Sequence, residues 1–87
     1  MKRNYDDPVY REWRLRVLKR DKFKCQMPLC NAKKNLQVHH IQKWSSASML
    51  RYEVSNGICL CRKCHQEVTR NEVYYQGLFM DIVRKKK

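Results

Sequence analysis

The chain has 87 residues, which allows one small domain with little apolar surface to bury, so that a bound metal or disulfides are expected to stabilise it. Lys and Arg number 20 against 8 Asp and Glu, and the formal net charge is +12. This excess favours a polyanionic partner, nucleic acid above all, over a basic surface that merely solvates the domain. No apolar signal-peptide core and no apolar run of membrane-spanning length is visible, so we expect a cytoplasmic protein without membrane contact.

The first predicted element is a helix from Pro8 to about Arg20, with Asp7 as its N-cap and proline at the first helical position. One apolar stripe recurs at four-residue spacing and consists of Val9, Trp13 and Val17. Trp13 is expected to be a core anchor. The arginines of this helix, Arg14 among them, have two interpretations: a solvated face or contacts to phosphate.

The five cysteines follow a pattern that favours metal binding. Cys25 and Cys30 have four residues between them, whereas Cys61 and Cys64 have two and are followed at once by His65. An odd number of cysteines argues against a simple disulfide framework, and reduced thiols in a cytoplasm favour zinc. Cys-x-x-Cys-His also spells haem attachment, but haem would leave the other cysteine pair without a role.

A β-hairpin with a long connection is predicted in the middle of the chain. Leu36 to Ile41 alternates loosely and is expected to be a strand, and the turn signal Asn56-Gly57 precedes a second short strand, Ile58 to Leu60. Between them, Ser45 or Ser46 would cap a short helical turn through Leu50 and Tyr52. Trp44 is expected in the core rather than as a platform against DNA. Phe23, in the turn before Cys25, is also assigned to the core.

A second helix is expected to begin at the Cys61–Cys64 pair and to continue past Asn71. A further apolar face is expected to consist of Val73, Tyr74, Gly77, Leu78 and Ile82. Gly77 allows a break or kink near the middle. The basic end, Arg84 to Lys87, is interpreted as a frayed, solvated tail rather than a DNA contact.

These residues resemble the HNH endonucleases over roughly Trp13 to Val68. The likeness lies in the pair His39-His40, the later Asn56, the His65 that follows Cys-x-x-Cys, and the segment Arg20 to Cys25, which is similar to R-D-x-(aromatic)-x-C. It implies an α+β fold: a small zinc-stapled ββα-metal core, a β-hairpin followed by a helix, with an N-terminal helix and a C-terminal helical extension. We expect a single HNH nuclease domain over residues 1–87 with its core at about 20–70. The four-residue gap between Cys25 and Cys30 departs from the two residues common in the family.

Two metal sites are expected. Four thiolates can close a tetrahedral shell around a structural Zn²⁺, and the ligands assigned are Cys25, Cys30, Cys61 and Cys64. The fifth, Cys59, is interpreted as a small buried side chain. Phosphodiester hydrolysis needs a second site that supplies an attacking water, a base and a cation.

The resemblance assigns the residues of that second site. His39 matches a ligand of the catalytic metal and His65 matches the second ligand; His40 matches the general base, and Asn56 matches the residue that braces the loop and orients the base. His39 and His40 would point to opposite faces of a strand and so have different roles. Two imidazoles without a carboxylate favour Mn²⁺, Ni²⁺, Co²⁺ or Zn²⁺, with Mg²⁺ also allowed.

The leading hypothesis is therefore a metal-dependent DNA endonuclease of low sequence specificity that nicks or cuts both strands, with Arg14, Lys63 and Arg70 as nucleic-acid contacts. A double-strand cut would need a homodimer or two visits. The alternatives are a non-catalytic zinc-stabilised DNA-binding module, or a subunit of a phage DNA-processing complex such as packaging. The resemblance implies a small standalone protein of a phage or its bacterial host.

Overall fold

The computed structural model describes residues 7–42 and 51–86, and it has an α+β fold built around one β-hairpin. Strand β1 (Leu36–His40) pairs antiparallel with strand β2 (Gly57–Cys61), and a short 3₁₀ helix, η2 (Val54–Asn56), leads directly into β2. The register places His40 opposite Gly57. The expected hairpin with a long connection is confirmed.

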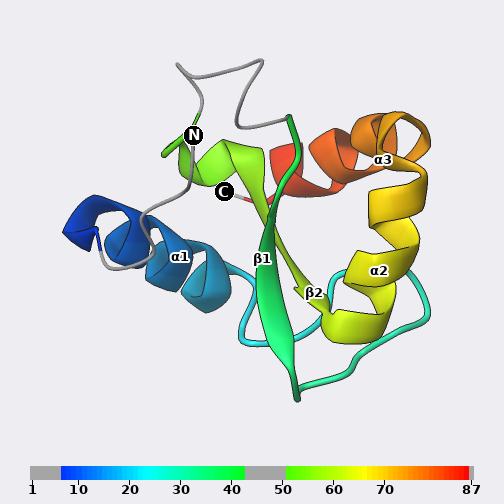
Figure 1. The fold of residues 1–87 in the computed structure, drawn as a ribbon, viewed down its shortest axis with the longest axis horizontal. Helices are drawn as coiled ribbons and strands as arrows, with labels where there is room; N and C mark the ends of the chain where they lie inside the picture. Colours follow the sequence, from blue (N-terminus) through cyan, green and yellow to red (C-terminus); the bar gives the residue numbers. More distant parts are fainter. Residues whose placement is uncertain (1–6, 43–50, 87) are drawn as a thin grey trace.

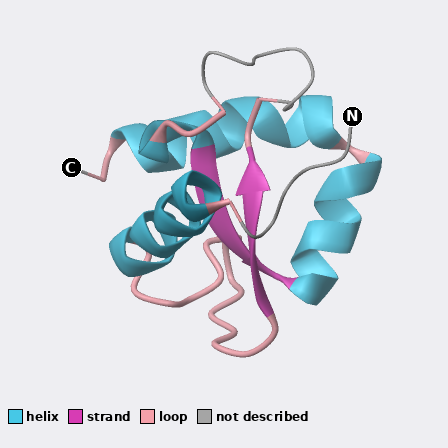
Figure 2. Cartoon of the chain, turned by 60° about the vertical axis from the view of Figure 1, so that its left-hand side comes forward, coloured by secondary structure: helices cyan, strands magenta, loops and turns pink. Residues whose placement is uncertain are grey.

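Three helices surround the hairpin. Helix α1 (Pro8–Arg20) lies on one side, and α2 (Arg62–Arg70) with α3 (Glu72–Arg84) lies on the other (Figure 1). Figure 2, seen from another direction, also shows the two strands crossing the middle of the molecule between helices. None of the helices in the described ranges is both long and apolar enough to cross a membrane.

Helices α1 and α2 begin at residues whose side chains cap them, whereas α3 has no side-chain cap. The Asp7 side chain accepts a hydrogen bond from the Val9 N–H at 2.9 Å, which satisfies one of the free donors at the start of α1. The Cys61 sulfur accepts from the Cys64 N–H in the same way at the start of α2, at 3.5 Å. The last residue of β2 therefore also caps the next helix.

The two faces of the hairpin pack against different helices. Val38 and Cys59, which are paired across the hairpin, join a buried cluster with Trp13 and other residues of α1. Ile58 and Leu60 face the other way and pack with Val68 of α2 and Phe79 of α3. Trp13 is 2% exposed, so its expected place in the core is confirmed. Because side chains alternate along a strand, His39 and His40 leave opposite faces.

Two apolar residues lie outside the core, contrary to the expectation from the sequence. Phe23 is 46% exposed, because Lys22 and Phe23 both adopt positive φ and turn the chain sharply as it leaves α1. The Phe23 N–H then bonds back to the Leu18 carbonyl at 2.9 Å while its ring faces solvent. Val9 is also exposed, and the buried stripe of α1 starts one residue later, at Tyr10.

The break or kink that Gly77 would allow does not occur at that residue. The chain bends at Asn71, whose φ of −138° and ψ of 43° end α2, and Gly77 lies within the continuous helix α3. The buried face of α3 also differs from the expected one: Phe79 and Val83 are buried, whereas Val73 and Tyr74 are 85% and 78% exposed. The predictions for Trp44, Ser45, Ser46 and Leu50 fall outside the described residues.

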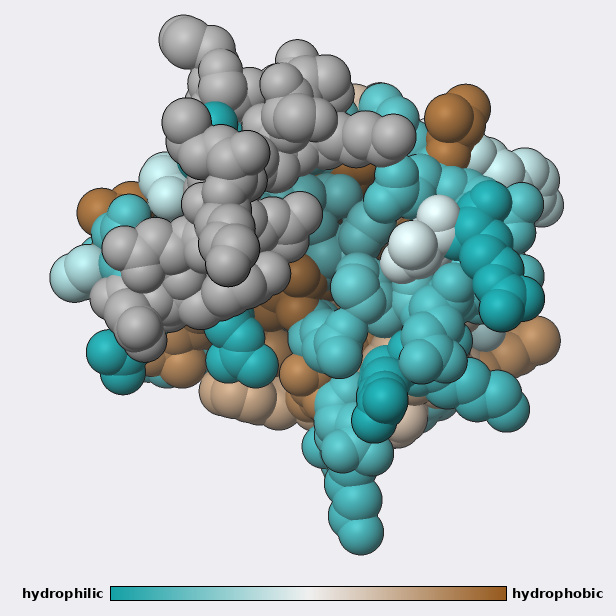
Figure 3. All heavy atoms as spheres, viewed as in Figure 1, coloured by the Kyte–Doolittle hydropathy of each residue, from teal (hydrophilic) through white to brown (hydrophobic). Residues whose placement is uncertain are grey.

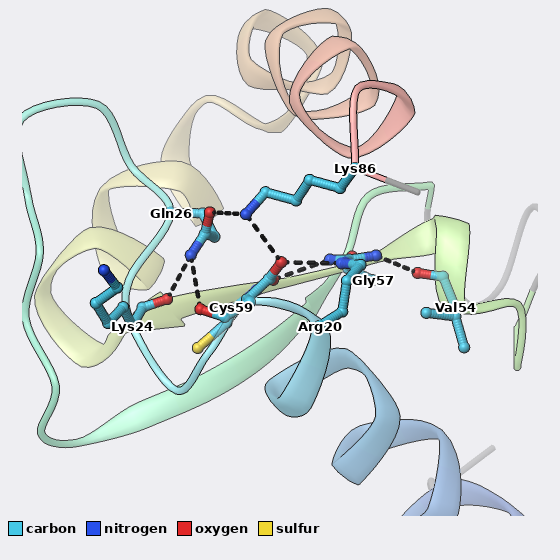
Figure 4. Close-up of polar contacts among 8 residues, drawn as sticks. Arg20, Lys24, Gln26, Val54, Gly57, Cys59 and Lys86 are labelled. Atoms are coloured by element: carbon cyan, nitrogen blue, oxygen red, sulfur yellow. Dashed lines mark hydrogen bonds and ion pairs between the residues drawn. The ribbon is translucent and has the colours of Figure 1, made fainter.

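A buried ion pair ties the end of α1 to the hairpin (Figure 4). Arg20 makes two 2.9 Å hydrogen bonds to the carboxylate of Asp21, and it also donates to the carbonyls of Val54 and Gly57 at 2.8 and 2.6 Å. Asp21 is 1% exposed and accepts a further bond from the Cys59 N–H at 2.9 Å. Helix α1, η2 and β2 are thereby fixed to one another through two neighbouring residues.

The basic end of the chain takes part in this network, so the expectation of a wholly solvated tail is wrong for Lys86. Its ammonium lies 3.5 Å from the Asp21 carboxylate and also donates to the side-chain carbonyl of Gln26. Arg84 and Lys85, at the C-terminal end of α3, are largely exposed and pair with Asp81 of that helix. The last turn of α3 is therefore anchored to the same junction as α1.

Candidate functional site

Four cysteines from two distant segments come together beside the hairpin. The sulfur atoms of Cys25, Cys30, Cys61 and Cys64 all lie within 4.8 Å of one another. The Cys30 and Cys61 sulfurs are 3.9 Å apart, far too long for a disulfide, and every cysteine is free. Zinc–sulfur bonds of about 2.3 Å in a tetrahedron place the sulfurs about 3.8 Å apart, so this donor set fits a structural Zn²⁺.

The wide spacing of the first cysteine pair is absorbed by a folded loop. The Cys25 N–H donates to the Ala32 carbonyl at 2.9 Å, and the Cys30 N–H donates to the Met27 carbonyl at 3.0 Å. Leu29 has a φ of 69° and its side chain projects into solvent. This left-handed residue turns the chain back, so that a gap of four residues still delivers both sulfurs to one point.

The cluster controls the protonation of its own thiols. Burial raises the pKa of Cys25, and burial together with hydrogen bonds to the other thiols raises that of Cys64. At Cys61 burial acts in the same direction, but hydrogen bonds from the Cys64 N–H and the neighbouring thiols outweigh it and lower the pKa. The Cys61 thiol, which caps α2, is therefore more easily ionised than those of Cys25 and Cys64, and metal binding would release protons from these two.

Cys59 stays apart from this cluster, as expected. It is fully buried between the hairpin and α1. Burial, with the nearby Asp21 carboxylate as the next cause, raises its pKa to about 12, so its thiol is neutral at physiological pH.

The imidazole of His40 is held at one edge and on one face. Its Nε2 lies 2.9 Å from the Arg51 carbonyl oxygen, and because a carbonyl can only accept, Nε2 carries the hydrogen. A neutral ring with hydrogen on Nε2 has its lone pair on Nδ1. The ring face stacks on the indole of Trp13, with centroids 4.2 Å apart and planes 14° apart, and the residue is buried.

His39 lies on the other face of the hairpin with His65. Their ring centroids are 5.3 Å apart, and the Phe79 ring closes over His39 at 6.0 Å. Metal–nitrogen bonds of about 2.0–2.1 Å allow two rings at this separation to bind one ion. Within the described residues only the four cysteines form a group of three or more metal-binding side chains, so any ion here would take its other ligands from water or substrate.

Asn56 connects the two ends of the long hairpin loop. Its side chain accepts a hydrogen bond from the Gln42 N–H at 2.8 Å and donates to the Gln42 carbonyl at 3.3 Å, while its own carbonyl accepts from the Ile41 N–H. It is 4% exposed. The buried amide thus fixes the backbone directly after His40.

The basic residues assigned to nucleic acid lie on two elements. Lys63 and Arg70 are exposed on α2, the helix that also carries His65, and their spacing of seven residues puts them on one helical face. Hydrophilic side chains cover most of the surface over α2 in Figure 3. Arg14 is half-buried on α1, on the opposite side of the hairpin.

Several contacts of this site had no signal in the sequence. The Arg51 carbonyl is a backbone group in a stretch without a readable pattern. The stacking of Trp13 on His40 joins residues from separate elements, although the tryptophan itself was assigned to the core. The dipeptide Arg20-Asp21 begins the R-D-x-(aromatic)-x-C segment, but only the fold shows that Asp21 is buried.

An antiparallel hairpin that leads into a helix, with a four-cysteine cluster at the junction, defines a zinc-stapled protein of the ββα-metal class. A family model of the HNH endonucleases matches residues 25–71, which is more than half of the chain. The chain belongs to the HNH endonuclease family. Comparison with curated proteins and with solved structures finds no match.

Proposed function

We propose that this protein is a metal-dependent DNA endonuclease that hydrolyses phosphodiester bonds, with His40 as the general base and with His39 and His65 as ligands of a divalent metal. Membership of the HNH family supports nuclease chemistry in general terms. The residue roles come from the resemblance to the family, and the geometry of the three histidines, which are all the histidines in the chain, is compatible with them.

The observation that carries the proposal is the hydrogen bond from His40 Nε2 to the Arg51 carbonyl. A general base must present an unprotonated nitrogen in a fixed direction. The carbonyl fixes the tautomer with the lone pair on Nδ1, and the Trp13 stack restricts rotation of the ring. In this proposal His40 takes a proton at Nδ1, an atom that is buried in the structure, so the attacking water has to reach it when substrate binds.

The pair His39 and His65 fits a catalytic cation better than a structural one. Two imidazoles leave most of the coordination positions open to water and phosphate oxygens, as a catalytic ion requires. When bound, such an ion would neutralise charge on the phosphate and on the leaving oxygen. Nitrogen ligands without a carboxylate favour Mn²⁺, Ni²⁺, Co²⁺ or Zn²⁺, and Mg²⁺ stays within the proposal because phosphate and water complete its shell.

Substrate would approach at the edge of β1. Within the described residues β1 pairs only with β2, so no further strand covers its other edge. His39 and His40 leave those two faces at neighbouring positions near the end of the strand. The proposal requires a phosphate at this edge to contact both histidines, which are 6% and 5% exposed, and Asn56 fixes the backbone at the same end.

DNA of low sequence specificity is the proposed substrate. The net charge of +12 favours contacts to phosphates, which carry no sequence information. Lys63 and Arg70, which are exposed on the helix that carries His65, would make such contacts. The free thiols suit the reducing environment of a phage-infected or uninfected bacterial cytoplasm.

Cleavage of supercoiled plasmid tests this function. The protein would be loaded with one zinc, freed of other metals and titrated with Mg²⁺, Mn²⁺, Ni²⁺ and Co²⁺. Metal-dependent nicking that leaves 5′-phosphate and 3′-hydroxyl ends is expected, with at least a hundredfold loss in His40→Gln and His40→Ala variants that retain zinc. DNA binding without cleavage by any metal would replace the proposal with a non-catalytic module, or with a subunit that needs a partner.

A further inference from the structure

Trp13 touches both the ring of His40 and the segment that holds that ring. The indole stacks on the imidazole with centroids 4.2 Å apart, and its Nε1 donates a 2.8 Å hydrogen bond to the Glu53 carbonyl. Glu53 lies two residues after Arg51, whose carbonyl accepts from His40 Nε2. One buried side chain from α1 therefore supports the face of the imidazole and, through the backbone, the partner at its edge.

The backbone opposite His40 is shaped to admit the indole. Gly57 pairs with His40 across the hairpin, and a Cβ atom at this position would lie 2.7 Å from Trp13 Cζ2 and 2.7 Å from Val17 Cγ2. Such a distance is far inside ordinary van der Waals contact. The absence of a side chain at position 57 thus lets the indole lie against the strands beside the imidazole.

Trp13 lies outside the part of the chain that matches the family model. The match covers residues 25–71, whereas Trp13 belongs to α1, which comes before it. The helix is held in place independently of Trp13: Tyr10, Val17 and Leu18 are also buried, and Arg20 bonds to the Val54 and Gly57 carbonyls. A change at Trp13 can therefore affect His40 without releasing the helix.

We propose that Trp13 is a positioning residue for the general base: it holds His40 in one ring orientation and keeps the Arg51 carbonyl in place as the acceptor for Nε2. This inference rests on the proposed function for its consequence in catalysis, since positioning matters only if His40 takes a proton. Its structural part, one fixed orientation and one tautomer of His40, stands apart from activity.

The test compares Trp13→Leu, Trp13→Phe and the matched control Leu18→Ala, a buried residue of the same helix and cluster. Leucine loses both the stacking face and the Nε1 donor, whereas phenylalanine keeps an aromatic face. We expect kcat for plasmid cleavage to fall roughly 10- to 100-fold in Trp13→Leu with little change in KM, because a small displacement of a catalytic group costs about this much. Trp13→Phe should recover most of the loss, and Leu18→Ala should keep its kcat.

The spectroscopic readout is the pair of ¹⁵N imidazole signals of His40 in zinc-loaded protein. The native protein should give one protonated and one unprotonated nitrogen, and Trp13→Leu should shift both toward an average of two tautomers. Unchanged signals together with unchanged kcat would overturn the proposal, as would an equal loss of kcat in Leu18→Ala. If the native protein cleaves no DNA with any metal, the proposed function fails, and the nitrogen signals alone decide whether Trp13 positions His40.

Discussion

The side-chain amide of Asn56 is paired with the backbone of Gln42 through two hydrogen bonds, one in each direction. Gln42 stands two residues after His40, and Asn56 stands directly before β2. These two hydrogen bonds join the ends of the long connection, as a further hydrogen-bonded residue pair of the hairpin would. Because Asn56 is buried, water cannot replace these bonds if the amide is lost.

Replacing Asn56 with alanine should therefore lower both stability and activity. The unsatisfied Gln42 backbone groups should cost about 1–3 kcal/mol in the free energy of unfolding. Cleavage should fall about 10- to 100-fold, since the backbone that carries His40 is no longer fixed. Urea unfolding and plasmid cleavage measure the two effects. Ser55→Ala, an exposed neighbour, should change neither, and equal activity in both variants would contradict the bracing role.

Removing the carboxylate of Asp21 should be far more damaging than removing that of Asp81. Asp21→Ala leaves the Arg20 guanidinium without its partner in a mostly buried position and the Cys59 N–H without an acceptor. Loss of one member of a buried ion pair costs about 3–5 kcal/mol. Asp81 also binds two cations, but it lies on the surface, so Asp81→Ala should leave the thermal midpoint almost unchanged. Similar midpoints for the two variants would refute the importance of this junction.

The elements that were predicted correctly had local causes. The helix from Pro8 to Arg20 had a capping aspartate and a proline at its start, and the hairpin had two apolar runs with Asn56-Gly57 between them. The cysteine spacing was enough to predict that four thiols would meet although 30 residues separate the pairs. Alternation along β1 correctly separated His39 from His40.

The failures concern features that depend on contacts between elements. Phe23 is hydrophobic, but the positive φ at two successive residues directs its ring to solvent, and composition gives no warning of this. Gly77 looked like the weak point of the last helix, yet α3 continues through it from Glu72 to Arg84. The burial of Asp21 depends on Arg20, Lys86 and a backbone N–H that converge only in the folded chain.

The two glycines should respond to alanine in opposite directions. Gly57→Ala puts a methyl group 2.7 Å from the Trp13 ring and from Val17, and this overpacking should cost about 1–3 kcal/mol. Gly77 lies inside α3 with nothing within 4 Å of an added Cβ, so alanine there should stabilise by about 0.5–1 kcal/mol. Thermal melts of both variants check the prediction, and destabilisation by Gly77→Ala would show that α3 is packed differently.

Zinc should be inseparable from the fold. Removing one of the four clustered thiols with Cys30→Ser should abolish binding of one equivalent of zinc and unfold the chain at 25 °C, because so small a core lacks the stability to fold without its metal. Cys59→Ala removes the buried cysteine of β2 that lies outside the cluster. This variant should keep the zinc, and its free energy of unfolding should fall by about 1–2 kcal/mol. Metal analysis and circular dichroism distinguish the two. A folded, metal-free Cys30→Ser protein would overturn the assignment.

Lys63 and Arg70 should act on DNA through charge alone. If each neutralises one phosphate, the double alanine variant should reduce the slope of log K against log salt concentration by about 1.8, at about 0.9 for each contact. Binding would be measured by fluorescence anisotropy on duplexes of unrelated sequence, in a His40→Gln background that does not cut. Arg84→Ala with Lys85→Ala removes two charges from α3, where both already pair with Asp81, and should change the slope much less. Equal losses from the two pairs would mean that the net charge of the protein, and not the α2 face, sets its affinity for DNA.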